Sequence, residues 1–234
     1  MMNKMAILNH KMNLLYDEVH NYINELNSID TDNDIVVCPS SLYLESFSNY
    51  CEWGVGCQNF YYEEEGNYTG EISTNQLKSM GIDYAMIGHY ERKKYFNDTL
   101  EDDKKKLEAL IDANIMPILC IGEEKKGDKI DNVIKKLDKV IKNISHIEFI
   151  TFAYEPSFSI NGDDMYDIEE LTLRIKTIYD YLEKKYKTKP RIVYGGGVTS
   201  NNIKKILQIE ELCGIILGTS SISISFVKDI VSNM

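Results

Sequence analysis

Short apolar segments alternate along the chain with longer segments that carry apolar residues on one helical face. Short apolar runs that end in polar or glycine-rich turns predict buried strands. These strands are expected at 5–8, 34–38, 53–58, 84–88, 116–121, 149–154, 191–194 and 213–217. Helices are expected between them at 16–26, 100–114, 133–143, 168–187 and 201–209. This order of strand and then helix is typical of a parallel sheet covered by helices.

The expected helix at 168–187 shows how the sheet is covered. Its apolar positions recur at helical spacing with Lys and Glu between them, so one face packs on a sheet and the other meets solvent. Eight such β/α units can close into a barrel or form an open doubly wound sheet. The number of units and the length of 234 residues favour a single (β/α)8 TIM barrel domain over residues 1–234.

Composition excludes several classes of function. The formal net charge of -11 argues against a nucleic-acid partner, because such binding needs Lys and Arg to neutralise phosphates. No apolar run reaches the roughly 20 residues of a membrane span, and the N-terminus carries no signal-peptide core. The five cysteines have no metal-site spacing, so free thiols and no metal are expected. A soluble cytoplasmic protein is therefore predicted.

Candidate chemistry follows the strands. The sixth strand ends in Glu155, which a proline follows, so this carboxylate lies at the mouth of the strand. Lys11 follows the first strand and His89 the fourth. In a barrel the loops after the strands share one face, so these three side chains should converge. Separately, Lys11 is typical of a solvated surface lysine and His89 of a structural histidine.

Glycines follow the last two strands. Gly195-Gly196-Gly197 comes after the seventh, and Gly218-Thr219-Ser220-Ser221 comes after the eighth, just before a short helix. Backbone N–H groups in such segments can approach a phosphate, although a tight turn and a helix cap are the simpler readings of each alone. Taken together, the strand ends supply a base, an electrophile, a cation and a phosphate cradle.

Eight short motifs in a fixed order resemble the triosephosphate isomerase family over residues 5–231. They are Asn9-x-Lys11-Met12-Asn13, Val37-Cys38-Pro39, Gly56-x-Gln58-Asn59, Thr69-Gly70-Glu71-Ile72-Ser73, Ile87-Gly88-His89-x-Glu91-Arg92, Cys120-Ile121-Gly122-Glu123, Ala153-Tyr154-Glu155-Pro156 and Tyr194-Gly195-Gly196. The resemblance implies a (β/α)8 barrel, a homodimer, a reaction of glycolysis and gluconeogenesis, and no metal or organic cofactor. Its reaction would interconvert D-glyceraldehyde 3-phosphate and dihydroxyacetone phosphate.

The resemblance also implies catalytic roles for five residues. Glu155 would be the base that moves a proton between two carbons, and neutral His89 would polarise the carbonyl. Lys11 would supply positive charge beside the enediolate, Asn9 would orient it, and Glu91 would lie close to Lys11. The physical requirement agrees, since proton removal beside a carbonyl needs a base and a donor fixed where the oxygen gains charge.

A second set of residues is implied for the substrate. Backbone N–H groups would hold the phosphate, and an apolar pair would press the base against the substrate under a closing lid that follows Glu155. The implied substrate-binding residues are Asn9, Lys11, Asn161, Gly197, Gly218, Thr219, Ile160 and Ile216. The loop at 61–69 resembles the segment that reaches the partner subunit in the family dimer.

The chain departs from the family pattern around the phosphate. Asn161 and Thr219 stand where the family has glycine, and Asp163 and Asp164 add carboxylates near the end of the lid. Two carboxylates near a phosphate dianion are unfavourable unless they point outward. Two alternatives therefore stand beside the triose reaction. One is a paralogous isomerase of a four-carbon sugar phosphate, and the other is a noncatalytic phosphate-metabolite-binding dimer.

Overall fold

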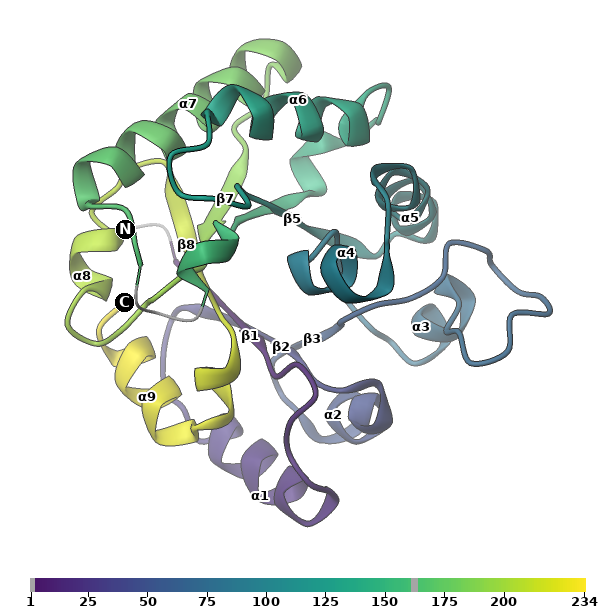
Figure 1. Ribbon diagram of the computed structural model, residues 1–234. Coiled ribbons are helices and arrows are strands. Elements are labelled where there is room, and N and C mark those ends of the chain that lie inside the picture. The colour runs from purple at the N-terminus through teal and green to yellow at the C-terminus, as the bar shows by residue number, and fades with distance from the viewer. Residues whose placement is uncertain (1–2, 161–163) are drawn as a thin grey trace.

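A computed structural model describes residues 3–160 and 164–234 of the chain. Eight parallel strands form a closed barrel in the order in which they occur in the sequence (Figure 1). The closed barrel, rather than an open sheet, is therefore confirmed. The strands are β1 Met5–Asn9, β2 Asp34–Cys38, β3 Gly54–Cys57, β4 Tyr84–Ile87, β5 Met116–Ile121, β6 Thr151–Tyr154, β7 Arg191–Tyr194 and β8 Leu212–Leu217.

The barrel closes where β8 pairs with β1. Met5 lies opposite Gly214 in this parallel pair. A side chain at Gly214 would collide with the backbone carbonyl of Met5, so the closure depends on a residue that has no Cβ.

Helices surround the barrel in Figure 1. The α-helices are α1 Tyr16–Asn27, α2 Leu44–Tyr50, α3 Thr74–Ser79, α4 Tyr90–Phe96, α5 Leu100–Ala113, α6 Ile130–Ile141, α7 Ile168–Tyr186, α8 Ile203–Ile206 and α9 Ile224–Ser232. Local side-chain hydrogen bonds and backbone conformation set where these helices begin and end. A capping box between Thr99 and Asp102 begins α5, and Asn114 in the left-handed region ends it. None of the described helices is long and apolar enough to cross a membrane.

Three predicted elements have bounds that differ from the structure by two residues or more. Helix α6 runs over 130–141 instead of 133–143. Strand β6 begins at Thr151 instead of 149, because Ile147–Phe149 forms a 3-10 turn (η2) in which Ile150 N donates to the Ile147 carbonyl. Phe149 is 52% exposed, so its apolar side chain does not belong to the sheet. The helix expected at 201–209 is regular only over Ile203–Ile206.

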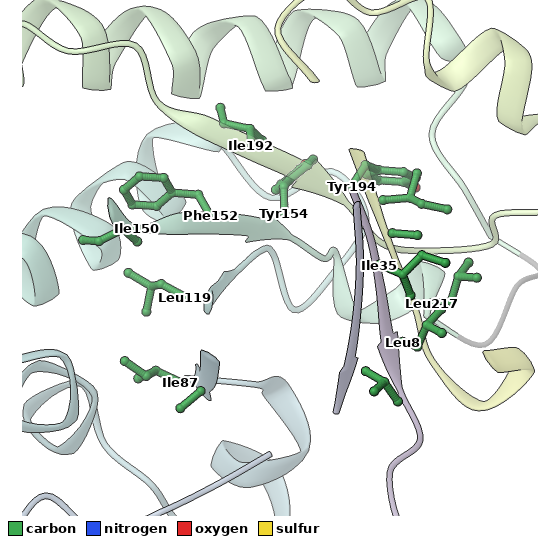
Figure 2. Packing of buried hydrophobic residues seen from close by; sticks show 14 of the residues in the cluster. Leu8, Ile35, Ile87, Leu119, Ile150, Phe152, Tyr154, Ile192, Tyr194 and Leu217 are labelled. Carbon is green, nitrogen blue, oxygen red and sulfur yellow. The ribbon is translucent and has the colours of Figure 1, made fainter. Parts of the chain in front are cut away.

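The apolar core forms two layers, one between the strands and helices and one inside the barrel. Successive side chains of a strand point to opposite faces. In β6, Phe152 and Tyr154 face the outer layer, while Ala153 faces the barrel interior. Figure 2 shows the outer-layer side chains of β6 beside Ile192 and Tyr194 of β7, their partners in the register.

The same alternation aims the functional side chains. In β1, Met5 and Ile7 belong to the interior layer, so the next position of that series is Asn9 at the mouth of the barrel. After Ala153 in β6, the next interior position is Glu155. A period of two therefore places both polar residues at the carboxyl end of the strands, facing the barrel axis.

Candidate active site

Glu155 lies just beyond β6 with its backbone held by the neighbouring strand. Its N–H donates to the carbonyl of Ile121 at 2.7 Å. Gly122 makes this close approach possible, since a Cβ there would collide with the backbone of Glu155. The residue is 9% exposed, and its Oε1 atom has no hydrogen-bond partner in the described part of the protein. The carboxylate is thus rigidly mounted and largely desolvated, with an oxygen ready to accept a proton.

The side chain of Glu155 fills the space over Gly195, at the end of β7. A Cβ at Gly195 would lie 2.8 Å from Glu155 Cγ and 2.5 Å from Ile216 Cγ2. Ile216 is 2% exposed and comes from the interior face of β8. Ile216 therefore lies against Glu155. Its expected companion, Ile160, is half-buried and adjoins residues 161–163, which the structure does not describe.

His89 occupies the N-cap of α4, one position before the helix. Its Nδ1 atom accepts the backbone N–H of Glu91 at 3.4 Å. A ring nitrogen that accepts an N–H carries no proton, so this hydrogen bond leaves the ring proton on Nε2. This Nε2 atom is buried, has no hydrogen-bond partner among the described residues, and lies 3.9 Å from Glu155 Oε2. A donor and an acceptor thus face the same small space.

Lys11 follows β1 in an unusual backbone conformation, with a φ of 54°. Its N–H donates to the side-chain oxygen of Asn9 at 3.1 Å. The Lys11 ammonium lies 2.7 Å from Glu91 Oε1. Asn9, Lys11 and Glu91 are therefore brought together, and Glu91 also contacts His89 through its backbone N–H.

Gln58 also supports Lys11, and sequence reasoning gave it no role in the site. Its side-chain amide donates to the carbonyl oxygens of Lys11 and Cys38, at 2.9 Å each. These two bonds tie the strained backbone of Lys11 to β2. The sequence did carry a signal for this role, because the amide side chain directly follows β3 and belongs to one of the motifs quoted above.

Three of the four residues expected to form the phosphate cradle belong to the described part of the protein. Gly197 has a φ of 57°, and its carbonyl accepts from Asn202 at 2.8 Å. Gly218 lies against Lys11, since a Cβ there would be 3.3 Å from Lys11 Cε. Thr219 begins a short 3-10 helix, η4 Thr219–Ile222, and is exposed. Asn161, the fourth position, lies outside the described residues.

The comparisons with known proteins agree over almost the entire sequence. The profile of the family named Triosephosphate isomerase matches residues 4–234. The chain belongs to the triosephosphate isomerase family. It is 33% identical over 229 residues to the Triosephosphate isomerase of Clostridium beijerinckii, covering 92% of each chain. It is also 33% identical over 246 residues to the Triosephosphate isomerase of Aquifex aeolicus, covering 99% of this chain and 100% of that one.

Two titratable groups near Glu155, Cys120 and Tyr90, have raised pKa values. Cys120 lies inside the barrel, and burial, followed by the nearby charge of Glu155, raises the pKa of its thiol. Burial and then the charge of Glu91 raise the pKa of Tyr90 to about 12. Both groups stay neutral at physiological pH, so they add no charge next to the Glu155 carboxylate. The Tyr90 ring lies 5.1 Å from the His89 ring, centroid to centroid.

A buried polar cluster of Glu123, Tyr154 and Arg174 supports the loop after Glu155. The Tyr154 hydroxyl lies 2.9 Å from both carboxylate oxygens of Glu123. Arg174 on α7 donates to Glu123 at 2.5 Å. The Glu123 carbonyl in turn accepts the N–H of Ser157, in the first turn of the expected lid. Sequence reasoning missed this cluster, whose members come from β6, α7 and the loop after β5.

The two ends of the expected lid belong to the described part of the protein. Its first turn is the 3-10 helix η3 Ser157–Ser159. At the other end, Asp164 is 55% exposed and forms an ion pair with Lys126. This carboxylate therefore points outward and pairs with the Lys126 ammonium. Asp163, the second added carboxylate, lies outside the described residues.

No group of three or more His, Cys, Asp or Glu residues within 3–160 and 164–234 could hold a metal ion. The described part of the site instead offers a carboxylate, an imidazole and an ammonium. Such a set can remove a proton from carbon and stabilise the oxygen that gains negative charge.

Proposed function

We propose that this protein interconverts D-glyceraldehyde 3-phosphate and dihydroxyacetone phosphate through an enediolate, in glycolysis and gluconeogenesis. The observation that carries the proposal is the separation of 3.9 Å between Glu155 Oε2 and His89 Nε2, with the Lys11 ammonium on the same face. Membership of the triosephosphate isomerase family supports it. No metal or organic cofactor enters the proposed reaction.

The proposed reaction moves one proton between adjacent carbons. Glu155 accepts the proton from the carbon beside the carbonyl, and the electron pair left behind forms the enediolate. His89 donates a proton from Nε2 to the oxygen that gains charge. The same nitrogen then takes the proton of the neighbouring hydroxyl, so the ring returns to its starting state. Glu155 then delivers its proton to the neighbouring carbon, so atoms and charges balance over the cycle.

Lys11 and the backbone of the last strands are proposed to bind the anionic parts of the substrate. The Lys11 ammonium lies against Gly218, so one cation can serve both the enediolate and the phosphate. Asn9 holds the Lys11 backbone, and Glu91 holds its ammonium. The N–H groups of Gly197, Gly218 and Thr219, with Asn161 of the lid, would receive the phosphate, while Ile160 and Ile216 would exclude water from Glu155.

The test compares substrates and one carboxylate variant. Purified wild type should turn over the triose phosphates far faster than a four-carbon sugar phosphate, and the reverse preference would sink the triose assignment. Glu155→Gln should lower kcat by orders of magnitude with the fold intact. Glu124→Gln is the matched control, because its side chain is 76% exposed and pairs with Lys136. If wild type turns over neither sugar phosphate, the noncatalytic binder is favoured.

We further propose a homodimer in which residues 61–69 enter a second copy. This segment projects from the barrel between β3 and α3 in Figure 1. Tyr61 packs on Tyr62 and Tyr68, with centroid distances of 4.3 and 4.5 Å, so the loop carries a tyrosine cluster. Aromatic side chains of this kind suit an interface.

A groove beside the catalytic residues is a suitable receptor for that loop. It has a volume of about 410 Å³ and is lined by Lys11, Met12, His89 and Phe96, among others. Met12 is 93% exposed and Phe96 61% exposed, which is unfavourable for large apolar side chains in a monomer. Sedimentation should give twice the chain mass, and replacing 63–68 by two glycines should give monomers. A monomeric wild type would contradict the proposal.

The proposed location is the cytoplasm. The structure leaves Cys38, Cys51, Cys57, Cys120 and Cys213 as free thiols. Reduced thiols are the usual state in that compartment. Fractionation of cells that make the protein tests this placement.

A further inference from the structure

Three aromatic rings pack together directly behind the turn that carries Lys11. His10 is completely buried and lies between Tyr22 of α1 and Phe47 of α2. Its ring meets Tyr22 edge-on, with centroids 4.6 Å apart and planes at 83°. It meets Phe47 in the same way at 5.6 Å and 70°. We call His10, Tyr22 and Phe47 the three-ring cluster.

The three-ring cluster is bonded to η4, the 3-10 helix that begins at Thr219. The Tyr22 hydroxyl donates to the carbonyl of Ser221 at 2.6 Å in a fully buried contact. Tyr22 is 4% exposed, and Ser221 is completely buried. Burial raises the pKa of Tyr22, so its hydroxyl keeps the proton that it donates.

No other side-chain hydrogen bond joins η4 to another element in the described part of the chain. The turn closes on itself through Ser221 N to the Gly218 carbonyl at 2.8 Å and Ser223 N to the Ser220 carbonyl at 3.1 Å. Thr219 and Ser220 at its start are exposed. Such a short 3-10 segment has poor internal hydrogen bonds, so its position depends on what holds it from outside.

We propose that Tyr22 is a positioning residue for phosphate binding, acting through its hydrogen bond to Ser221. The inference rests on the proposed function, in which the backbone at Gly218 and Thr219 receives the substrate phosphate. Backbone donors bind a phosphate well only when they are fixed within a fraction of an ångström. The Tyr22 hydroxyl fixes the carbonyl end of η4, and the edge-on His10 ring fixes the plane of Tyr22.

The three-ring cluster also links the two anion-binding elements. His10 precedes Lys11 in the chain, and its N–H donates to the Cys38 carbonyl at 3.1 Å. Lys11 in turn lies against Gly218, the residue before η4. One packed unit therefore sets the position of the ammonium through His10 and that of the phosphate backbone through Tyr22.

The test removes one oxygen atom. Tyr22→Phe keeps the ring and deletes only the donor to Ser221. We expect KM for the triose phosphates, and the inhibition constant for inorganic phosphate, to rise about threefold to tenfold, the effect of one lost buried hydrogen bond. The rate of proton exchange on D-glyceraldehyde, which has no phosphate, should stay within twofold of wild type. Tyr181→Phe is the matched control, since its hydroxyl bonds Asp138 at 2.7 Å, between α7 and α6.

A second readout does not require activity. Inorganic phosphate should raise the melting temperature of wild type and of Tyr181→Phe more than that of Tyr22→Phe. Equal phosphate effects in all three proteins would overturn the inference, as would an equal loss on D-glyceraldehyde and the triose phosphates. Failure of the proposed function is distinguishable, because it would appear as a wild type with no triose phosphate turnover.

Discussion

His89 Nε2 and Glu155 Oε2 face each other at 3.9 Å across the mouth of the barrel, although they follow different strands, β4 and β6. This separation is too long for a direct hydrogen bond. Neither group is therefore hydrogen-bonded to the other, and both can engage a substrate atom that lies against them. The predictions below test how the surrounding residues maintain this arrangement.

Replacing His89 with glutamine should lower kcat about 10²- to 10⁴-fold, because the Nε2 donor beside the developing oxyanion is lost. The melting temperature should fall only slightly, since Nε2 has no protein partner among the described residues and the ring loses one long cap bond, from the Glu91 N–H to Nδ1. His20→Gln is the control, because His20 is exposed on α1. Steady-state kinetics and a melting curve provide the readouts. Unchanged kcat in His89→Gln would remove His89 from the mechanism.

The substitution Gln58→Met should lower kcat/KM by releasing the backbone of Lys11. Methionine fills a similar volume but donates to neither the Lys11 nor the Cys38 carbonyl. The Lys11 backbone, at a φ of 54°, is then free to relax away from the site. We expect kcat/KM to fall about tenfold, as for a small displacement of a catalytic group. Gln208→Met, at an exposed position, should have wild-type kinetics, and an equal loss in both variants would contradict the role of Gln58.

Gly195→Ala should displace the base. The added methyl would lie 2.8 Å from Glu155 Cγ and 2.5 Å from Ile216 Cγ2, so both side chains must move. A loss of about 10²-fold in kcat is expected from misplacement of the carboxylate. Adding Ile216→Ala makes room for the methyl and should recover part of the loss relative to Ile216→Ala alone. Undiminished kcat in Gly195→Ala would show that this packing does not position Glu155.

His10 should make the protein sensitive to acid. Burial lowers the pKa of His10 from 6.5 to about 3. Between these values the unfolded chain binds a proton that the folded protein does not, so the free energy of unfolding falls as pH falls, by about 1.4 kcal/mol per pH unit. In His10→Phe this slope should be shallower by that amount between pH 6 and pH 4. Urea unfolding at several pH values checks it, and equal slopes in both proteins would contradict the prediction.

Side-chain periodicity alone could predict much of the site. Asn9 and Glu155 continue the interior series of β1 and β6, and both occupy that face in the structure. Periodicity wrongly placed Phe149 in β6, because an apolar residue in a 3-10 turn looks the same in sequence as one in a strand. The short helices α2 and α3 were also missed, since few turns give a weak periodic pattern.

The sequence by itself determined the barrel, the family, and the types of residue at the mouths of the strands, because strand order, apolar spacing and local motifs are properties of neighbouring positions. Only the tertiary structure decided which distant groups support them. Gln58 under Lys11, Tyr22 on Ser221 and Glu123 between Tyr154 and Arg174 are contacts between separate elements. Such contacts depend on how helices and loops pack around the barrel, and no local pattern in the chain records that packing.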